Sequence, residues 1–224
     1  MNDRLIGRAG FLGLLGAGTA GLFYGGKAQS WLGRVVPQQI QAIVPTAGWR
    51  IYTIGDSMPN IQPAAYRLAV GGMVDAPRSF SLDDLKSLKR AEQVSTFHCV
   101  TGWTVDNVHW AGFRIKDLLA EVKPHASATS IRFTSAEPGY NDSLTLDQAL
   151  LGDVLLAYEM DGAPLPRPHG APLRLVIPEM YGYKNVKWVT QLELLPHATA
   201  GYWEQHGYDV NAWVGRSNGL GSGA

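Results

Sequence analysis

The sequence has only one cysteine, Cys99, among its 224 residues. A single thiol cannot form a disulfide within the chain, so cross-linked scaffolds are excluded. For the same reason, the cysteine content does not assign the protein to an oxidising or a reducing compartment. Three interpretations of Cys99 stay open at this point: a small buried side chain, a nucleophile, or a metal ligand.

The sequence also lacks an excess of charge of either sign. It contains 19 basic and 19 acidic side chains, so its formal net charge at pH 7 is zero. A neutral chain produces no overall field that would attract nucleic acid or an anionic membrane surface. We therefore expect no nucleic-acid partner.

Common catalytic signatures are missing as well. The sequence has no Walker A loop, no H-E-x-x-H, no G-x-S-x-G, and no G-x-G-x-x-G that follows a strand pattern. Its six histidines are not spaced as in a zinc site. His98 precedes Cys99, but neighbours on a strand point to opposite faces, which argues against a papain-like Cys-His pair.

The N-terminus resembles a targeting segment. Residues 9–26 carry no charged side chain, and they lie between Arg8 and Lys27. This is the layout of an export signal or of a single membrane anchor, although its glycines lower its hydrophobicity. A buried helix of a soluble domain fits less well, because the run has no polar face. We expect residues 1–30 to be an export signal or a membrane anchor.

The remaining chain predicts a mixed, sheet-rich α+β domain over residues 45–196. Residues 27–65 are rich in turn formers, and strand and helix patterns then alternate without a βαβ rhythm. Ser81 and Asp84 form a capping-box pattern at the start of a short helix. The aromatic tail, residues 197–224, is expected to pack on this domain. Strands are predicted at 66–74, 92–98, 130–136, 153–160, 171–178 and 186–195, and further helices at 115–122 and 144–151.

Positive charge is concentrated between residues 167 and 188. Arg174 interrupts an otherwise apolar strand there, and an unpaired buried guanidinium would cost several kcal/mol. It can be neutralised by a local carboxylate such as Glu159 or Glu179, or by an anionic ligand such as a phosphate. The only acidic residue of this segment is Glu179, whereas its basic residues are Arg167, His169, Arg174, Lys184 and Lys187.

Two stretches resemble a known family. "FHCVTGW", with the "IKDLL" that follows it, and "HGAPLRLVIPEMYGYKNVKW" resemble the molybdopterin-binding domain of the sulfite oxidase superfamily. The chain is most similar to small bacterial members that include the periplasmic methionine-sulfoxide reductase catalytic subunit. The resemblance covers residues 49–195 and implies a sulfite-oxidase-type fold that binds molybdenum and molybdopterin.

The resemblance also implies a set of site residues. Cys99 corresponds to the cysteine whose thiolate binds molybdenum, which suits a soft, sulfur-rich metal centre. The corresponding cofactor-binding positions are His169, Arg174 and Lys187 for the pterin and its phosphate, Asn185 and Val186 through backbone groups, Tyr52 and Thr53 near the N-terminus, and Ser135 in mid-chain. Trp103, His109 and Trp110 are candidates for the pocket wall or, alternatively, core aromatics.

The implied activity is oxygen-atom transfer coupled to two-electron redox. The substrate would be a small oxyanion, a sulfoxide or a protein sulfoxide. His169 agrees with sulfite oxidases where the reductases tend to have Asn, while Thr101 stands where those reductases tend to carry Glu, so neither substrate class is favoured. Two other functions stay open: a non-catalytic anion-binding module on the same scaffold, and a thiol enzyme that uses Cys99 as nucleophile.

The resemblance implies a monomer that exchanges electrons with a separate partner, such as a membrane cytochrome or a quinone-linked protein. An extracytoplasmic location is expected, in the periplasm or on the outer face of the membrane, with membrane contact through residues 9–26. "GRAGFLG" resembles the twin-arginine export box, although Ala9 replaces its second arginine.

Overall fold

A computed structural model of the protein describes residues 48–217. The chain divides at residue 50 into two compact units, and the second unit, from Ile51, contains both β-sheets of the protein. The predicted signal or anchor, residues 1–30, and the last seven residues, 218–224, lie outside the described residues.

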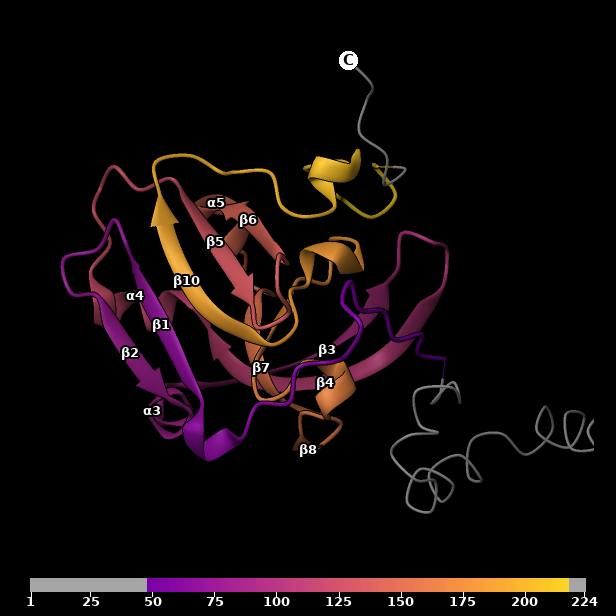
Figure 1. The fold of residues 1–224 in the computed structure, drawn as a ribbon, viewed down its shortest axis with the longest axis horizontal. Helices are drawn as coiled ribbons and strands as arrows, with labels where there is room; N and C mark the ends of the chain where they lie inside the picture. Colours follow the sequence, from indigo (N-terminus) through magenta and orange to yellow (C-terminus); the bar gives the residue numbers. More distant parts are fainter. Residues whose placement is uncertain (1–47, 218–224) are drawn as a thin grey trace, which may run out of the picture. The chain divides into compact units, whose positions relative to one another are not determined.

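The first of two β-sheets has its last strand in sequence at its centre (Figure 1). The order is β2-β1-β10-β5-β6, where β10 is Val189–Leu195. β10 runs parallel to β1 and antiparallel to β5, so segments far apart in the sequence become neighbours. The other strands of this sheet are β1 (Arg67–Gly72), β2 (Arg78–Ser81), β5 (Ser130–Ser135) and β6 (Asn141–Thr145).

The second sheet is built on a long hairpin. β3 (Arg90–His98) pairs with β4 (Thr104–Arg114), and β4 pairs in turn with β7 (Leu155–Met160). The order is β3-β4-β7-β8, with β8 at Ala163–Pro164, and β9 (Arg174–Val176) also pairs with β7. Because the Cys99 turn connects β3 to β4, this hairpin carries the only cysteine to its tip.

The described helices are short. α3 begins after the predicted capping box, in which Ser81 Oγ accepts from the Asp84 N–H and Asp84 accepts from the Ser81 N–H. None of the helices within residues 48–217 has the length and apolarity needed to cross a bilayer. The helices are α3 (Leu82–Ser87), α4 (Ile115–Val122) and α5 (Leu146–Ala149), with 3-10 turns η1 (Pro63–Ala65), η2 (Arg167–His169), η3 (Gly182–Lys184) and η4 (Glu204–His206).

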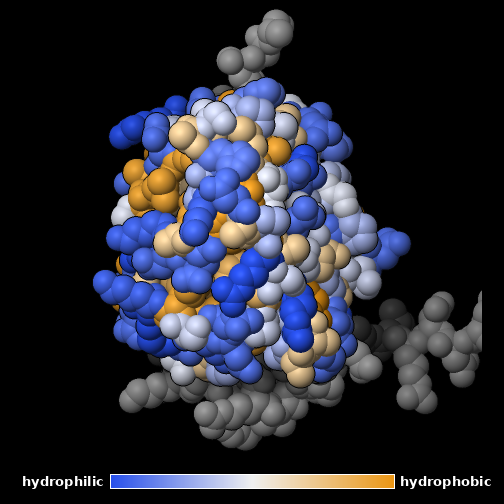
Figure 2. Space-filling model, turned by 90° about the vertical axis from the view of Figure 1, so that its left-hand side faces the viewer, coloured by the Kyte–Doolittle hydropathy of each residue, from blue (hydrophilic) through white to orange (hydrophobic). Residues whose placement is uncertain are grey.

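The hydrophobic core draws on both sheets and on α3 and α4. Leu68 and Leu192 of the first sheet are fully buried, as are Phe113 and Leu156 of the second. Burial of side chains of this size contributes about 1.5–3 kcal/mol each. On the face shown in Figure 2, hydrophobic side chains reach the surface in small groups between polar ones.

The α+β, sheet-rich class predicted from the sequence is confirmed, but one long strand was not predicted. β4 lacks clean alternation because Asn107 adopts a positive φ of 56° and the β4–β7 register shifts between Ala111 and Gly112. A Cβ at Gly112 would lie 1.9 Å from the Leu156 carbonyl oxygen, so the close approach of β7 requires glycine there. The predicted helix at 144–151 is only the four residues of α5, because Leu144 and Thr145 belong to β6.

Candidate active site

Cys99 lies in a tight turn at the tip of the β3–β4 hairpin. The Cys99 N–H donates to the Trp103 carbonyl oxygen at 2.9 Å, and the Gly102 N–H donates to the Cys99 carbonyl oxygen at 3.0 Å. The Cys99 Sγ lies 3.1 Å from Thr101 Oγ1. The thiol is partly exposed, whereas a cysteine that only fills space is usually fully buried. The Cys99 side chain is therefore not enclosed in the core.

Aromatic side chains support this turn. The Trp103 ring centroid lies 5.6 Å from that of Phe97 and 6.4 Å from that of Tyr52. The Phe97 ring also packs on the backbone of η3, since a Cβ at Gly182 would lie 2.3 Å from its Cζ. These contacts bring the N-terminal lead-in and the η3 loop to the Cys99 turn.

Arg174 is a buried cation on β9, with 2% of its surface exposed. Its guanidinium donates to the carbonyl oxygens of His169 (3.1 Å) and Leu175 (3.3 Å), and its Cζ lies 4.9 Å from the Trp110 ring centroid. Among the ion pairs of residues 48–217, none includes Arg174. Of the two local carboxylates considered from the sequence, Glu159 pairs with Arg90.

His169 and Lys187 complete a group of three basic side chains, in which burial and the charge of Arg174 lower the pKa of the other two. Burial, followed by the charges of Arg174 and Lys187, lowers the pKa of His169 to about 3. Burial and Arg174 lower the pKa of Lys187 to about 7, against a smaller opposing effect of Glu137. Burial also lowers the pKa of Arg174 to about 10. Positive charge therefore predominates in this group, which favours an anionic ligand.

Gly170 fixes the spacing of these three side chains. It has φ of 108°, and a Cβ there would lie 3.0 Å from the Lys187 Cβ and 3.1 Å from the Arg174 Cβ. A left-handed residue without a side chain is thus needed directly after His169. The turn can then pack on both cations.

The structure also brings together the predicted residues of the lead-in and of mid-chain. Lys187 Nζ donates to the Tyr52 carbonyl oxygen at 2.7 Å. Ser135 Oγ donates to the Lys187 carbonyl oxygen at 2.8 Å, and Thr53 Oγ1 donates to the Gly55 carbonyl oxygen at 3.0 Å. Four of the predicted cofactor-binding positions therefore lie in one hydrogen-bonded region.

Asn185 and Val186 lie in the same loop, but their backbone N–H groups have partners within it. The Asn185 N–H donates to the Gly182 carbonyl oxygen and the Val186 N–H to the Lys184 carbonyl oxygen. The Asn185 side chain accepts from the Ile177 N–H at 2.7 Å and so braces the loop. Their contact with a cofactor through backbone groups stays a prediction.

Of the three candidate wall residues, His109 lies away from the Cys99 turn. The tip of the β3–β4 hairpin is marked by the pair His98 and Thr104. His109 pairs with Val94, several residue pairs away from this tip. Trp110 is buried beneath the Arg174 guanidinium. Only Trp103 belongs to the turn that carries Cys99.

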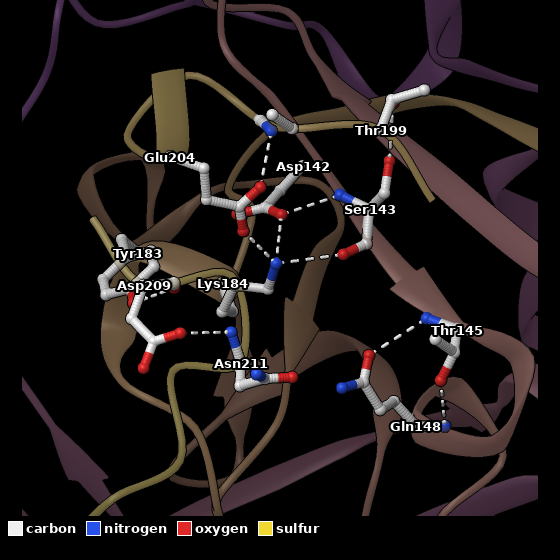
Figure 3. Close-up of polar contacts among 12 residues, drawn as sticks. Asp142, Ser143, Thr145, Gln148, Tyr183, Lys184, Thr199, Glu204, Asp209 and Asn211 are labelled. Carbon is white, nitrogen blue, oxygen red and sulfur yellow. Dashed lines mark hydrogen bonds and ion pairs between the residues drawn. The ribbon is translucent and has the colours of Figure 1, made fainter. Parts of the chain in front are cut away.

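From the sequence, Lys184 was grouped with the site cations, and its two carboxylate partners were not predicted. Figure 3 shows the Lys184 Nζ between Asp142 and Glu204, with the Ser143 carbonyl oxygen at 3.0 Å. Burial raises the pKa of Asp142 to about 7, with Lys184 opposing and Glu204 adding to this effect. Lys184 is thus a buried ion-pair residue, which joins the η3 loop to β6 and η4. Glu137, another buried carboxylate near the site, was also missed.

The cation group predicts a pH dependence for protein without a bound anion. The pKa of Lys187 is about 7 in the folded state and 10.5 for the ordinary side chain, so unfolded chains bind more protons between these values. The unfolding free energy should therefore rise with pH across this window, because the penalty of the charged Lys187 is relieved. Urea unfolding at pH 7.5 and 9.5 measures this rise. It should be smaller in Lys187→Met, and equal rises in the two proteins would contradict the prediction.

The comparisons with known proteins agree on one family. Residues 55–203 match the model for the oxidoreductase molybdopterin binding domain. The uncharacterized oxidoreductase YuiH of Bacillus subtilis is 36% identical over 193 residues, which cover 84% of this chain and 93% of YuiH. The protein-methionine-sulfoxide reductase catalytic subunit MsrP of Ralstonia nicotianae is 32% identical over 151 residues, 61% of this chain and 45% of MsrP.

Mitochondrial sulfite oxidase of Homo sapiens is 32% identical over 180 residues, which cover 67% of this chain and 33% of that protein. The chain thus spans less than half the length of MsrP and of sulfite oxidase. The crystal structure of the sulfane dehydrogenase SoxCD from Paracoccus pantotrophus has a TM-score of 0.61 at 24% identity, covering 64% of this chain and 41% of that one. At this identity the likeness shows the fold alone.

The donor set of the site suits molybdopterin. A pterin phosphate would pair with the buried Arg174 guanidinium, which takes part in none of the ion pairs within residues 48–217. The partly exposed Cys99 would offer the metal a soft sulfur donor. The sulfite-oxidase-type fold and the molybdopterin cofactor predicted from the sequence are confirmed by the family match and the relatives. The chain belongs to the oxidoreductase molybdopterin-binding domain family of the sulfite oxidase superfamily, and it is a molybdenum-molybdopterin oxidoreductase.

Proposed function

We propose that this oxidoreductase reduces a neutral sulfoxide, either a small molecule or an oxidised methionine side chain. When bound, the molybdenum cofactor supplies the two-electron redox and oxygen-atom transfer chemistry. Cys99 would be the protein ligand of the metal, and Arg174, His169 and Lys187 would hold the pterin and its phosphate. The observation that carries the proposal is the link between the Cys99 turn and the buried Arg174. The Trp103 ring of that turn packs on Phe97, whose ring centroid lies 5.8 Å from the Arg174 Cζ, and none of the ion pairs within residues 48–217 includes Arg174.

The turn around Cys99 supports a neutral substrate. Residues 99–103 include Thr101 and Trp103 but no charged side chain. Sulfur groups pack favourably against aromatic rings, and Thr101 offers a hydroxyl that can donate to a sulfoxide oxygen. A sulfite dianion would find no cation within this turn. The similarity to MsrP, a protein-methionine-sulfoxide reductase, supports the same substrate class.

The proposed setting is extracytoplasmic, with electrons supplied by a separate membrane-associated partner. The support lies in the sequence of residues 1–30, whose uncharged run follows two arginines. The designation of MsrP as a catalytic subunit is consistent with a second component for that protein. Fractionation of cells that express the full chain tests the location, and recovery in the cytosol alone would contradict it.

The function is tested with protein from a host that makes molybdopterin. We expect about one molybdenum and one pterin per chain, because Cys99 and the cation group form one site. With a reduced viologen as donor, methionine sulfoxide and dimethyl sulfoxide should be turned over. Sulfite oxidation with ferricyanide should be much slower.

The results of these assays distinguish the proposed sulfoxide reductase from the other candidate functions. Folded protein without molybdenum or pterin would overturn the proposal and favour the anion-binding module if pyrophosphate still raises its melting temperature. Faster turnover of sulfite than of either sulfoxide would overturn the substrate class. Metal-free turnover that is blocked by alkylation of Cys99 would favour a thiol enzyme.

A further inference from the structure

The segment from Tyr52 to Gly55 is held by two oppositely charged side chains. On one side, Lys187 Nζ donates to the Tyr52 carbonyl oxygen at 2.7 Å. On the other, Glu137 Oε1 accepts from the Ile54 N–H at 2.6 Å and from the Gly55 N–H at 3.1 Å. The lead-in segment has no helix or strand of its own here, so these contacts determine its path.

Glu137 is well placed to act as a rigid support. Only 3% of its surface is exposed, and its own N–H donates to Ser135 Oγ at 3.0 Å. Ser135 Oγ donates in turn to the Lys187 carbonyl oxygen at 2.8 Å. The contacts therefore form a closed ring that runs through Ser135, Lys187, Tyr52, Ile54 and Glu137.

The charge of Glu137 matters in addition to its shape. A buried carboxylate is costly unless it is hydrogen-bonded or near a cation, and Glu137 has two backbone donors and lies near Lys187. Hydrogen bonds to an ionised acceptor are about twice as strong as neutral ones. An ionised Glu137 can thus order a segment that a neutral side chain would hold only weakly.

From this ring we propose that Glu137 is a positioning residue of the cofactor site. It orders the Tyr52–Gly55 segment so that Tyr52 and Thr53 face the molybdopterin, and it offsets the charge of Lys187 before the cofactor arrives. This role rests on the proposed assignment of Tyr52, Thr53 and Lys187 to the cofactor. Glu137 would thus belong to the site as a supporting carboxylate that does not itself contact the cofactor.

The test compares wild type, Glu137→Ala and Glu137→Gln, with Glu121→Ala as the matched control. Glu121 is an exposed carboxylate of α4 that pairs with Arg78. Hydrogen exchange of the cofactor-free proteins reports on peptides that contain Ile54 and Gly55. Bound pterin per chain, followed over time after dilution of the loaded proteins, reports on cofactor retention.

In Glu137→Ala we expect faster exchange confined to residues 51–58 and loss of pterin about tenfold faster or more. Glu137→Gln retains an acceptor oxygen without the charge, so it should lie between alanine and wild type in both measurements. Glu121→Ala should match wild type.

Two results would overturn the role of Glu137. One is pterin retention in Glu137→Ala equal to that of wild type. The other is faster exchange in every peptide, including those of β5 and β10, which would mean a general loss of stability. Wild-type protein without pterin would instead overturn the proposed function, and the exchange data would still show whether Glu137 orders the segment.

Discussion

Replacement of Cys99 by serine is expected to abolish turnover while leaving the fold intact. Serine is nearly the same size, but its hydroxyl stays protonated at neutral pH and offers a hard oxygen where a soft thiolate is required. Loss of residues that only orient a metal ligand costs 10–100-fold. Loss of the ligand itself should therefore exceed about 100-fold in kcat. Turnover of methionine sulfoxide per bound molybdenum measures the effect.

The same variant should change the visible spectrum of the bound metal centre, because one sulfur donor is lost. Melting temperatures close to that of wild type would show that the β3–β4 turn still folds, as its two backbone hydrogen bonds do not involve the side chain. Cys99→Ala serves as a second variant that offers no donor atom. Turnover per molybdenum equal to wild type in either variant would exclude Cys99 as the ligand.

Replacement of Lys184 by methionine is expected to cause the largest loss of stability. It would leave Asp142 and Glu204 as two buried carboxylates without their cation (Figure 3). Removal of one partner from a buried ion pair costs about 3–5 kcal/mol. Urea unfolding at pH 7 measures the loss. Lys89→Met, at an exposed lysine between α3 and β3, should stay within about 0.5 kcal/mol of wild type.

The pH dependence identifies the mechanism of this loss. Without Lys184 the two carboxylates repel each other, so the folded state should bind a proton more tightly than the unfolded chain does. The deficit relative to wild type should therefore shrink as the pH falls from 7 to 5. A deficit that stays constant, or one equal to that of Lys89→Met, would show that the charges of this cluster contribute little.

The local features that could be predicted from the sequence are those that neighbouring residues determine. The helix at 115–122 and the Ser81 capping box are examples, because periodicity and capping act within a few residues. β4 was missed because its irregularities at Asn107 and Gly112 follow from its position between β3 and β7. Such tertiary effects override local propensity.

The sequence could predict which types of residue form the site, but not which side chains contact one another. The basic segment showed that negative charge was needed, yet nothing in "YGYKNVKW" distinguishes Lys184 from Lys187. Lys184 has carboxylate partners 42 residues before it and 20 residues after it, and Glu137 accepts from Ile54 83 residues away. Contacts over such separations depend on the sheet topology, which a single sequence does not specify.

The central position of β10 has a consequence for synthesis of the protein. While residues 189–195 are still inside the ribosome, β1 and β5 lack the strand that joins them, and the first sheet is two separate hairpins. Unpaired strand edges of this kind are prone to aggregate. Arg174 and Lys187 emerge only shortly before this strand, so we expect the nascent chain to retain a cofactor only after residues 174–195 have been made.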